Sequence, residues 1–146
     1  MPAAPEVPMK KKPFLIIIFL LAAAAIAGSL LYLHFRPVAS AVSEDGRWKG
    51  WIVKTGENEF TGYLAFQEGT GDPGEIHMQY CGDTACRYGT LTPDEEPFGT
   101  LQALVLGSRT KVKYSIAAYP PGVPEALQYI MEWQEDGEKR TDTLVW

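Results

Sequence analysis

The chain has 146 residues, of which 46% are hydrophobic, and a formal net charge of −5. This length suits one small domain with short additions. From residue 44 onward, 17 acidic side chains stand against nine basic ones. An acidic balance without a basic patch argues against nucleic acid and against an anionic membrane surface as ligands.

The N-terminal part combines a short tail with a long apolar segment. Residues 1–13 are expected to form a short cytoplasmic tail that contains Lys10-Lys11-Lys12, and its first nine residues, which are rich in proline, are expected to be disordered. Of the twenty residues from Phe14 to Leu33, twelve are Phe, Ile or Leu and none is charged. Twenty helical residues reach roughly 30 Å, the thickness of a bilayer's hydrocarbon core. The sequence therefore predicts a transmembrane helix, a signal anchor, over residues 14–35.

The lysines predict the orientation of this helix. Three lysines precede the apolar run, and the first cation after it is Arg36. Because positive charge stays on the cytoplasmic side, the N-terminus is expected in the cytoplasm. Residues 37–146 are then expected outside, in the periplasm of a bacterium, with the anchor in the cytoplasmic (inner) membrane.

A cleaved signal peptide is the alternative for this segment. Ala25-Ile26-Ala27 and Ala39-Ser40-Ala41 both offer a small residue on each side of a central one, as signal peptidase sites do. However, the apolar run continues through Leu33, whereas the apolar core of a signal peptide usually has about 7–15 residues. This length favours a retained anchor.

After the helix, residues 36–45 are expected to be a linker of small residues, and residues 46–146 to form an extracytoplasmic β-domain. The domain shows alternating polar and apolar residues rather than helical periodicity. Its short connections favour antiparallel pairing between neighbouring strands. The expected strands cover residues 47–55, 59–67, 75–81, 86–92, 99–106, 109–119, 126–134 and 139–146. The fold class is therefore all-β: a small antiparallel up-and-down barrel, or a barrel-like sandwich, of about eight strands.

The start of the domain, Gly46-Arg47-Trp48, resembles the Gly-x-Trp start of lipocalin-like barrels. As an analogy of architecture, this resemblance implies a barrel that can hold one small apolar ligand.

Two cysteines, Cys81 and Cys86, are separated by four residues. Export to an oxidising compartment predicts a disulfide between them. The spacing differs from the Cys-x-x-Cys of thiol–disulfide enzymes, which have two residues between their cysteines. A second interpretation, ligation of soft copper by these cysteines with His77 and Met78, has no second cluster to support it.

All four tryptophans lie in the β-domain, at positions 48, 51, 133 and 146. A small fold needs large side chains to bury enough apolar area, so core packing is one interpretation of Trp48, Trp51, Trp133 and Trp146. The other is that these aromatic residues line a ligand cavity or form an exposed binding patch. They are the candidate binding residues of the sequence.

Signatures of catalysis and cofactor binding are missing from the sequence. The domain has one histidine, His77, and no Gly-x-Ser-x-Gly motif accompanies it. The acidic run Asp94-Glu95-Glu96 lacks the spacing of a calcium loop, and Arg109, Lys111 and Lys113 form a small cationic stripe. We expect neither a catalytic site, a metal, nor a cofactor.

Three functions remain open. The first is a non-enzymatic binding or accessory subunit of a membrane or cell-envelope complex, with a membrane or periplasmic protein as its partner. The second is a lipocalin-like receptor, carrier or sensor partner for a small hydrophobic ligand, and the third is a periplasmic enzyme. A carrier should contain an internal apolar cavity, whereas an accessory subunit should show a filled interior together with an exposed patch or edge strand.

Overall fold

The computed structural model describes residues 2–5, 11–82, 85–116 and 128–146. The chain forms two compact units, Met1–His34 and Phe35–Trp146.

The first unit contains helix α1 (Lys11–Phe35), which starts three residues earlier than the predicted span 14–35 and ends with it. An 18-residue window within Lys12–Phe35 has a mean hydropathy of 2.8, so the helix is long and apolar enough to cross a membrane. The Ser29 hydroxyl donates a hydrogen bond to the Ala25 carbonyl oxygen at 2.8 Å. This polar group is therefore satisfied inside the helix, as a lipid environment requires.

The second unit is a sandwich of two antiparallel four-stranded sheets. Sheet A has the order β1-β2-β3-β6 and sheet B the order β5-β4-β7-β8. The strands are β1 (Pro37–Val42), β2 (Trp48–Lys54), β3 (Phe60–Phe66), β4 (Ile76–Cys81), β5 (Cys86–Leu91), β6 (Tyr114–Ile116), β7 (Gln128–Glu135) and β8 (Glu138–Val145). The two sheets do not close into a barrel, and the barrel-like sandwich of the sequence analysis is confirmed.

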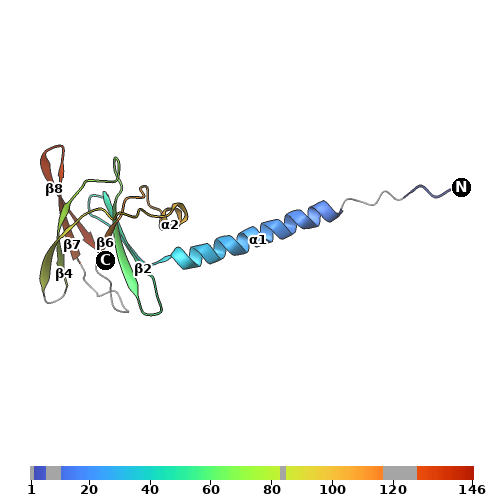
Figure 1. Cartoon of the computed structure of the whole chain (residues 1–146), viewed down its shortest axis with the longest axis horizontal. Coiled ribbons are helices and arrows are strands. Elements are labelled where there is room, and N and C mark those ends of the chain that lie inside the picture. Colours follow the sequence, from blue (N-terminus) through green and yellow to red (C-terminus); the bar gives the residue numbers. More distant parts are fainter. Residues whose placement is uncertain (1, 6–10, 83–84, 117–127) are drawn as a thin grey trace. The chain divides into compact units, whose positions relative to one another are not determined.

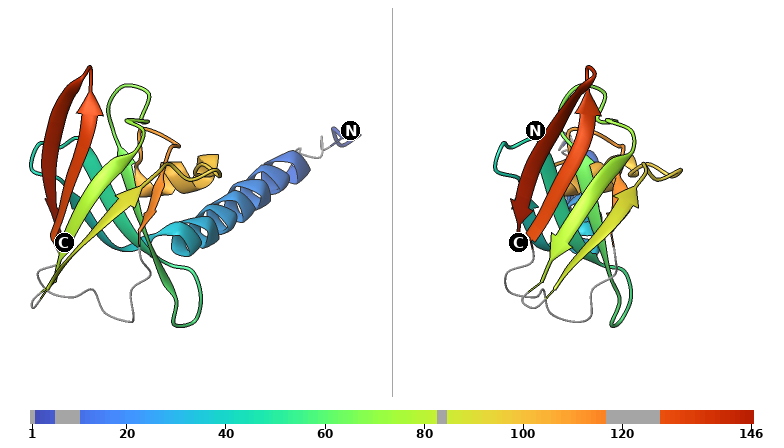
Figure 2. Two further views of the ribbon diagram at one scale, coloured as in Figure 1. Left: turned by 60° about the vertical axis from the view of Figure 1, so that its left-hand side comes forward. Right: turned by 90° about the vertical axis from the view of Figure 1, so that its left-hand side faces the viewer.

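Two cores hold this unit together, one on each face of sheet A. Between the sheets, Trp48 of β2 lies 5.6 Å from Trp133 of β7 and 5.2 Å from Phe66 of β3, measured between ring centres. On the other face of sheet A, Trp51 and Tyr63 pack with Phe98 and with helix α2 (Thr100–Leu106). Figures 1 and 2 show the resulting order of layers, from sheet B through sheet A to α2.

Helix α2 corrects one predicted strand. Residues 99–106, which are apolar at both alternating sets of positions, were predicted to form a strand. That prediction was wrong. In the helix, Ala103 and Leu106 face the core at a spacing of three residues, while Leu101 and Leu104 face solvent. Gly107 ends the helix in the left-handed conformation, with φ 65°, which glycine adopts without steric strain.

Three further expectations differ from the structure. The expected linker 36–45 contains strand β1, which pairs with β2. The expected strand 109–119 is reduced to Tyr114–Ile116, and residues 117–119 lie outside the described residues. Pairing between successive strands fails after β3, because the chain crosses to sheet B and β6 later returns to pair with β3.

Candidate functional site

The tryptophans singled out by the sequence are packing residues. Trp48, Trp51 and Trp133 are at most 2% exposed. Trp146 is half-buried and packs its ring 6.0 Å from that of Tyr129. The Trp51 indole also donates a hydrogen bond to the Leu106 carbonyl oxygen at 2.8 Å, which fixes α2 on sheet A. These tryptophans therefore do not form an aromatic binding patch at the surface.

The predicted disulfide between Cys81 and Cys86 is present. These residues are the last register pair of the β4–β5 hairpin, so the bond holds the two strands together at the turn. The copper interpretation fails for two reasons. Both sulfurs are used in the disulfide, and the neighbouring Met78 is buried on the inner face while His77 is exposed on the outer one.

The outer face of sheet B carries the most developed surface feature among the described residues. Since side chains alternate along a strand, His77 and Gln79 of β4 point away from the core. The strand registers align two rows across this face. One row joins Thr90, His77 and Glu132, and the other joins Tyr88, Gln79 and Ile130.

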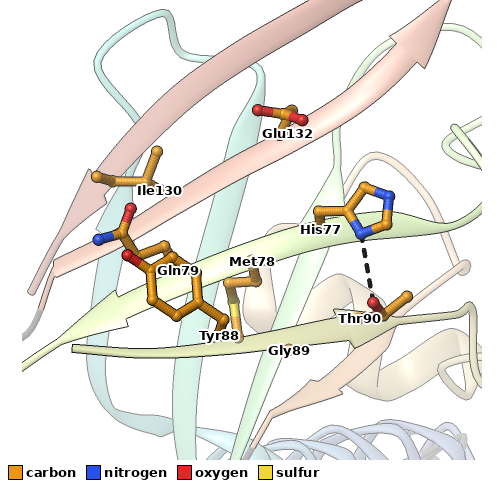
Figure 3. Close-up of a pocket in the computed structure, with 8 residues that line it drawn as sticks. All are labelled: His77, Met78, Gln79, Tyr88, Gly89, Thr90, Ile130 and Glu132. Atoms are coloured by element: carbon orange, nitrogen blue, oxygen red, sulfur yellow. Dashed lines mark hydrogen bonds between the residues drawn. The ribbon is translucent and has the colours of Figure 1, made fainter.

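A half-open hollow of about 440 Å³ lies over these two rows. Figure 3 shows Tyr88, Gln79 and Ile130 gathered at one end of it. His77 and Thr90 lie at the other end, where the imidazole Nδ1 and the threonine hydroxyl are 3.3 Å apart. The hollow therefore offers an aromatic and aliphatic end and a hydrogen-bonding end. Its remaining lining residues are Met78, Gly89 and Glu132.

Strand β5 borders this hollow and forms the edge of sheet B. Residues 86–90 are all exposed, and Tyr88 retains 78% of its accessible surface. Two other sheet edges make further contacts: beside β6, the Ser115 backbone N–H donates a hydrogen bond to the Asp94 carboxylate at 3.1 Å. Beside β8, the Glu44 N–H donates to the Thr143 carbonyl oxygen at 2.8 Å. Among the described residues, no segment covers β5 in this way.

The surroundings of His77 do not provide a catalytic geometry. Its Nε2 lies 4.0 Å from a Glu75 carboxylate oxygen, so Thr90, His77 and Glu75 follow the order of a nucleophile, a base and an acid. However, the His77 and Glu75 side chains are 64% and 58% exposed. Water competes for every hydrogen bond at such exposure, and neither side chain is held by packing. The cluster is better suited to binding than to catalysis.

The charged segments noted in the sequence have structural partners. Asp94 binds both the backbone and the hydroxyl of Ser115, the latter at 2.6 Å. Lys113 places its ammonium group 4.8 Å from the centre of the Tyr63 ring. Burial, and next to it the charge of Asp94, raise the pKa of the Tyr63 phenol. Within the described residues, no group of three or more His, Cys, Asp or Glu side chains is arranged to hold a metal ion.

Sequence reasoning identified His77 but did not single out Tyr88 and Ile130. Their signal was present in the alternation of their strands, which places both on the outer face. Their exposure and the open edge beside them follow only from the strand order β5-β4-β7.

Comparison with known proteins adds no relative: no protein-family model, no curated protein and no solved structure matches this chain.

Proposed function

We propose that this protein is a membrane-anchored accessory subunit whose β-domain binds a protein partner through strand β5 and the adjoining hollow. One observation carries the proposal. Strand β5, an edge strand that no described segment covers, borders a hollow of about 440 Å³ and is joined to β4 by the Cys81–Cys86 disulfide.

The membrane topology in this proposal rests on helix α1 and its flanking charges. The helix runs to Phe35, and its apolar part is longer than the apolar core of a signal peptide, which is the ground for proposing a retained anchor. Lys10-Lys11-Lys12 precede the apolar run, so we infer that the N-terminus lies in the cytoplasm of a bacterium and the domain in the periplasm. The Cys81–Cys86 disulfide is compatible with that oxidising compartment.

Strand addition is the mode of binding that suits this surface. An extended segment of the partner would pair with the backbone of β5, and its alternate side chains would enter the hollow. Tyr88 is the natural anchor residue, because an aromatic ring offers a large contact area with few rotatable bonds. A two-residue spacing between pocket-filling side chains is expected in the partner, as in any strand.

Close packing of the described residues between the sheets supports a binding subunit over a carrier. Trp48, Leu64 and Tyr114 are each 0% exposed between the sheets. Aromatic rings in this core meet edge to face at centre distances of 5.6 Å, so side chains occupy the space that an apolar ligand would need.

One observation favours the carrier as a second candidate. Five buried polar atoms in the described structure have no hydrogen-bond partner, and they belong to Trp48, Tyr129, Trp133, Asp142 and Trp146. Unpartnered buried groups are rare because each one costs about 1–3 kcal/mol. A small ligand with polar groups, or water, would satisfy them. Native mass spectrometry of the purified full chain tests this candidate, and a stoichiometric bound small molecule would favour it.

The partner proposal is tested by affinity purification of the full-length protein from its own membrane after chemical crosslinking. We expect one stoichiometric protein partner with the natural chain and its loss with Tyr88→Lys. Thr141→Lys is the matched control, because Thr141 is also exposed on the outer face of sheet B but lies on β8, away from β5. Recovery of no stoichiometric partner, or equal recovery with Tyr88→Lys, contradicts the proposal.

A further inference from the structure

Exposed apolar side chains gather on the side of sheet A that faces away from sheet B. Strand β1 contributes Val38 and Val42, which are 53% and 56% exposed. Helix α2 contributes Leu101 and Leu104, which are 50% and 75% exposed. We call these four residues the β1–α2 face.

Hydrogen bonds and register show that β1 and α2 lie on the same side of sheet A. Val42 is paired with Lys49 of β2. The Lys49 ammonium group donates to the Leu106 and Gly107 carbonyl oxygens at 3.3 and 3.4 Å, at the C-terminal end of α2. Lys49 therefore lies between Val42 and the C-terminal end of α2, and both apolar elements lie on the same side of the domain.

The chain connection keeps the start of β1 close to the end of α1. Val38 follows the last residue of α1, Phe35, by three positions. At about 3.3 Å per extended residue, that separation is at most roughly 10 Å. If α1 spans the membrane, β1 starts at the level of the lipid headgroups.

We propose that the β1–α2 face lies on the lipid bilayer in which α1 is anchored, with Leu101 and Leu104 inserted at the boundary between headgroups and acyl chains. The inference rests on the membrane anchoring given under Proposed function. The occupant of the face is the phospholipid surface itself, because a connection of three residues keeps β1 within reach of that surface when α1 spans the membrane.

The charges around α2 fit a mainly apolar contact. Lys111 donates to the Thr100 hydroxyl at 2.9 Å beside the start of α2, and Lys49 lies at its end. Both ammonium groups already donate hydrogen bonds within the domain, so neither depends on a lipid phosphate for a partner. The acidic run Asp94–Glu96 precedes Phe98 of the same core and offsets these cations. Docking should therefore not require anionic lipid, in agreement with the acidic balance of the domain.

This arrangement has a consequence for the partner site. Sheet B covers the opposite side of sheet A (Figure 2). With the β1–α2 face on lipid, the hollow and β5 point away from the membrane and stay open to a periplasmic partner.

The test uses the full chain in phosphatidylcholine vesicles, with and without phosphatidylglycerol, and a nitroxide attached at Leu104→Cys. Thr141→Cys on the outer face of sheet B is the control site, and the two natural cysteines are held in their disulfide. Collision rates with oxygen, which concentrates in lipid, and with a water-soluble nickel chelate are measured by electron paramagnetic resonance. We expect high oxygen and low nickel collision at position 104 and the reverse at position 141, in both lipid mixtures.

Three outcomes overturn the inference. The first is equal nickel collision at both sites in vesicles. The second is protection of position 104 from both reagents, which indicates a protein cover. The third is a signal that depends on protein concentration, which indicates a second copy. Alkaline carbonate extraction separates this inference from the anchoring. A chain released by carbonate refutes the anchor, whereas a retained chain with an exposed position 104 refutes only the docking.

Discussion

Two tryptophans on one strand provide a sharp test of the packing described for sheet A. Trp48 and Trp51 of β2 are 0% and 1% exposed, on opposite faces of the strand. The Trp51 indole N–H donates to Leu106 at 2.8 Å, whereas the Trp48 N–H is buried without a partner in the described structure. Replacing each by phenylalanine exchanges the indole for a smaller phenyl ring and removes the N–H, but the consequences differ.

The difference in stability between the two variants follows from the hydrogen bonds, because both indoles are fully buried and lose the same atoms. Trp51→Phe loses a hydrogen bond with a net contribution of about 1 kcal/mol to the free energy of unfolding. Trp48→Phe removes an unsatisfied donor and so recovers about 1–3 kcal/mol. Trp51→Phe should therefore be the less stable variant by about 2 kcal/mol or more.

Urea unfolding of the full chain in detergent micelles, followed by circular dichroism, measures this difference. With an m-value of about 1–1.5 kcal/mol/M, the urea midpoint of Trp51→Phe should lie about 1–2 M below that of Trp48→Phe. Hydrogen exchange adds a local readout, because only Trp51→Phe should speed exchange of the α2 amides. Equal midpoints, or a lower midpoint for Trp48→Phe, would refute the reasoning and indicate that the Trp48 N–H has a partner, such as water or a ligand.

Three further predictions concern the remaining structure. Gly50→Ala should lower stability by about 1–3 kcal/mol, measured by urea unfolding, because a Cβ there would lie 2.8 Å from the Trp146 ring; an unchanged midpoint would contradict the close approach. Burial, and next to it the charge of Asp72, raise the pKa of Tyr114, so the unfolded chain loses this proton near pH 10 while the folded chain keeps it. Stability should therefore be full below pH 10 and fall as the pH rises above it, and Tyr114→Phe should flatten that profile of urea midpoints. Cys81 and Cys86 should react with a maleimide only after reduction of the natively expressed protein, and reduction should lower stability by about 2 kcal/mol; free thiols before reduction would place the domain in a reducing compartment.

The strands that could be predicted are those whose alternation is strong and whose ends carry turn residues. Strand β7 alternates Tyr129, Met131 and Trp133 toward the core. It is joined to β8 through Asp136 and Gly137, which both have positive φ, as the Asp-Gly pair indicates. Such local signals are sufficient to predict the strand, because one of its faces is buried along its length and the other is more exposed.

The errors arose where tertiary contacts decide the structure. The apolar residues of α2 fit both the period of a helix and that of a strand. The helical form depends on the Trp51 hydrogen bond and on packing with Phe98 in the same core. Strand β1 consists mostly of small residues, and pairing with β2 makes it a strand. The partner surface at β5 depends on strand order, which alternation and turn signals do not encode.

The central claim is that β5 is the partner-binding edge of a membrane-anchored domain. The most direct measurement places the photoreactive residue p-benzoylphenylalanine at Tyr88, and separately at Thr141, in the full-length protein in its own membrane. The account predicts one discrete crosslinked protein from position 88 and none from position 141. Crosslinking from position 141 alone, or from neither position, would contradict it.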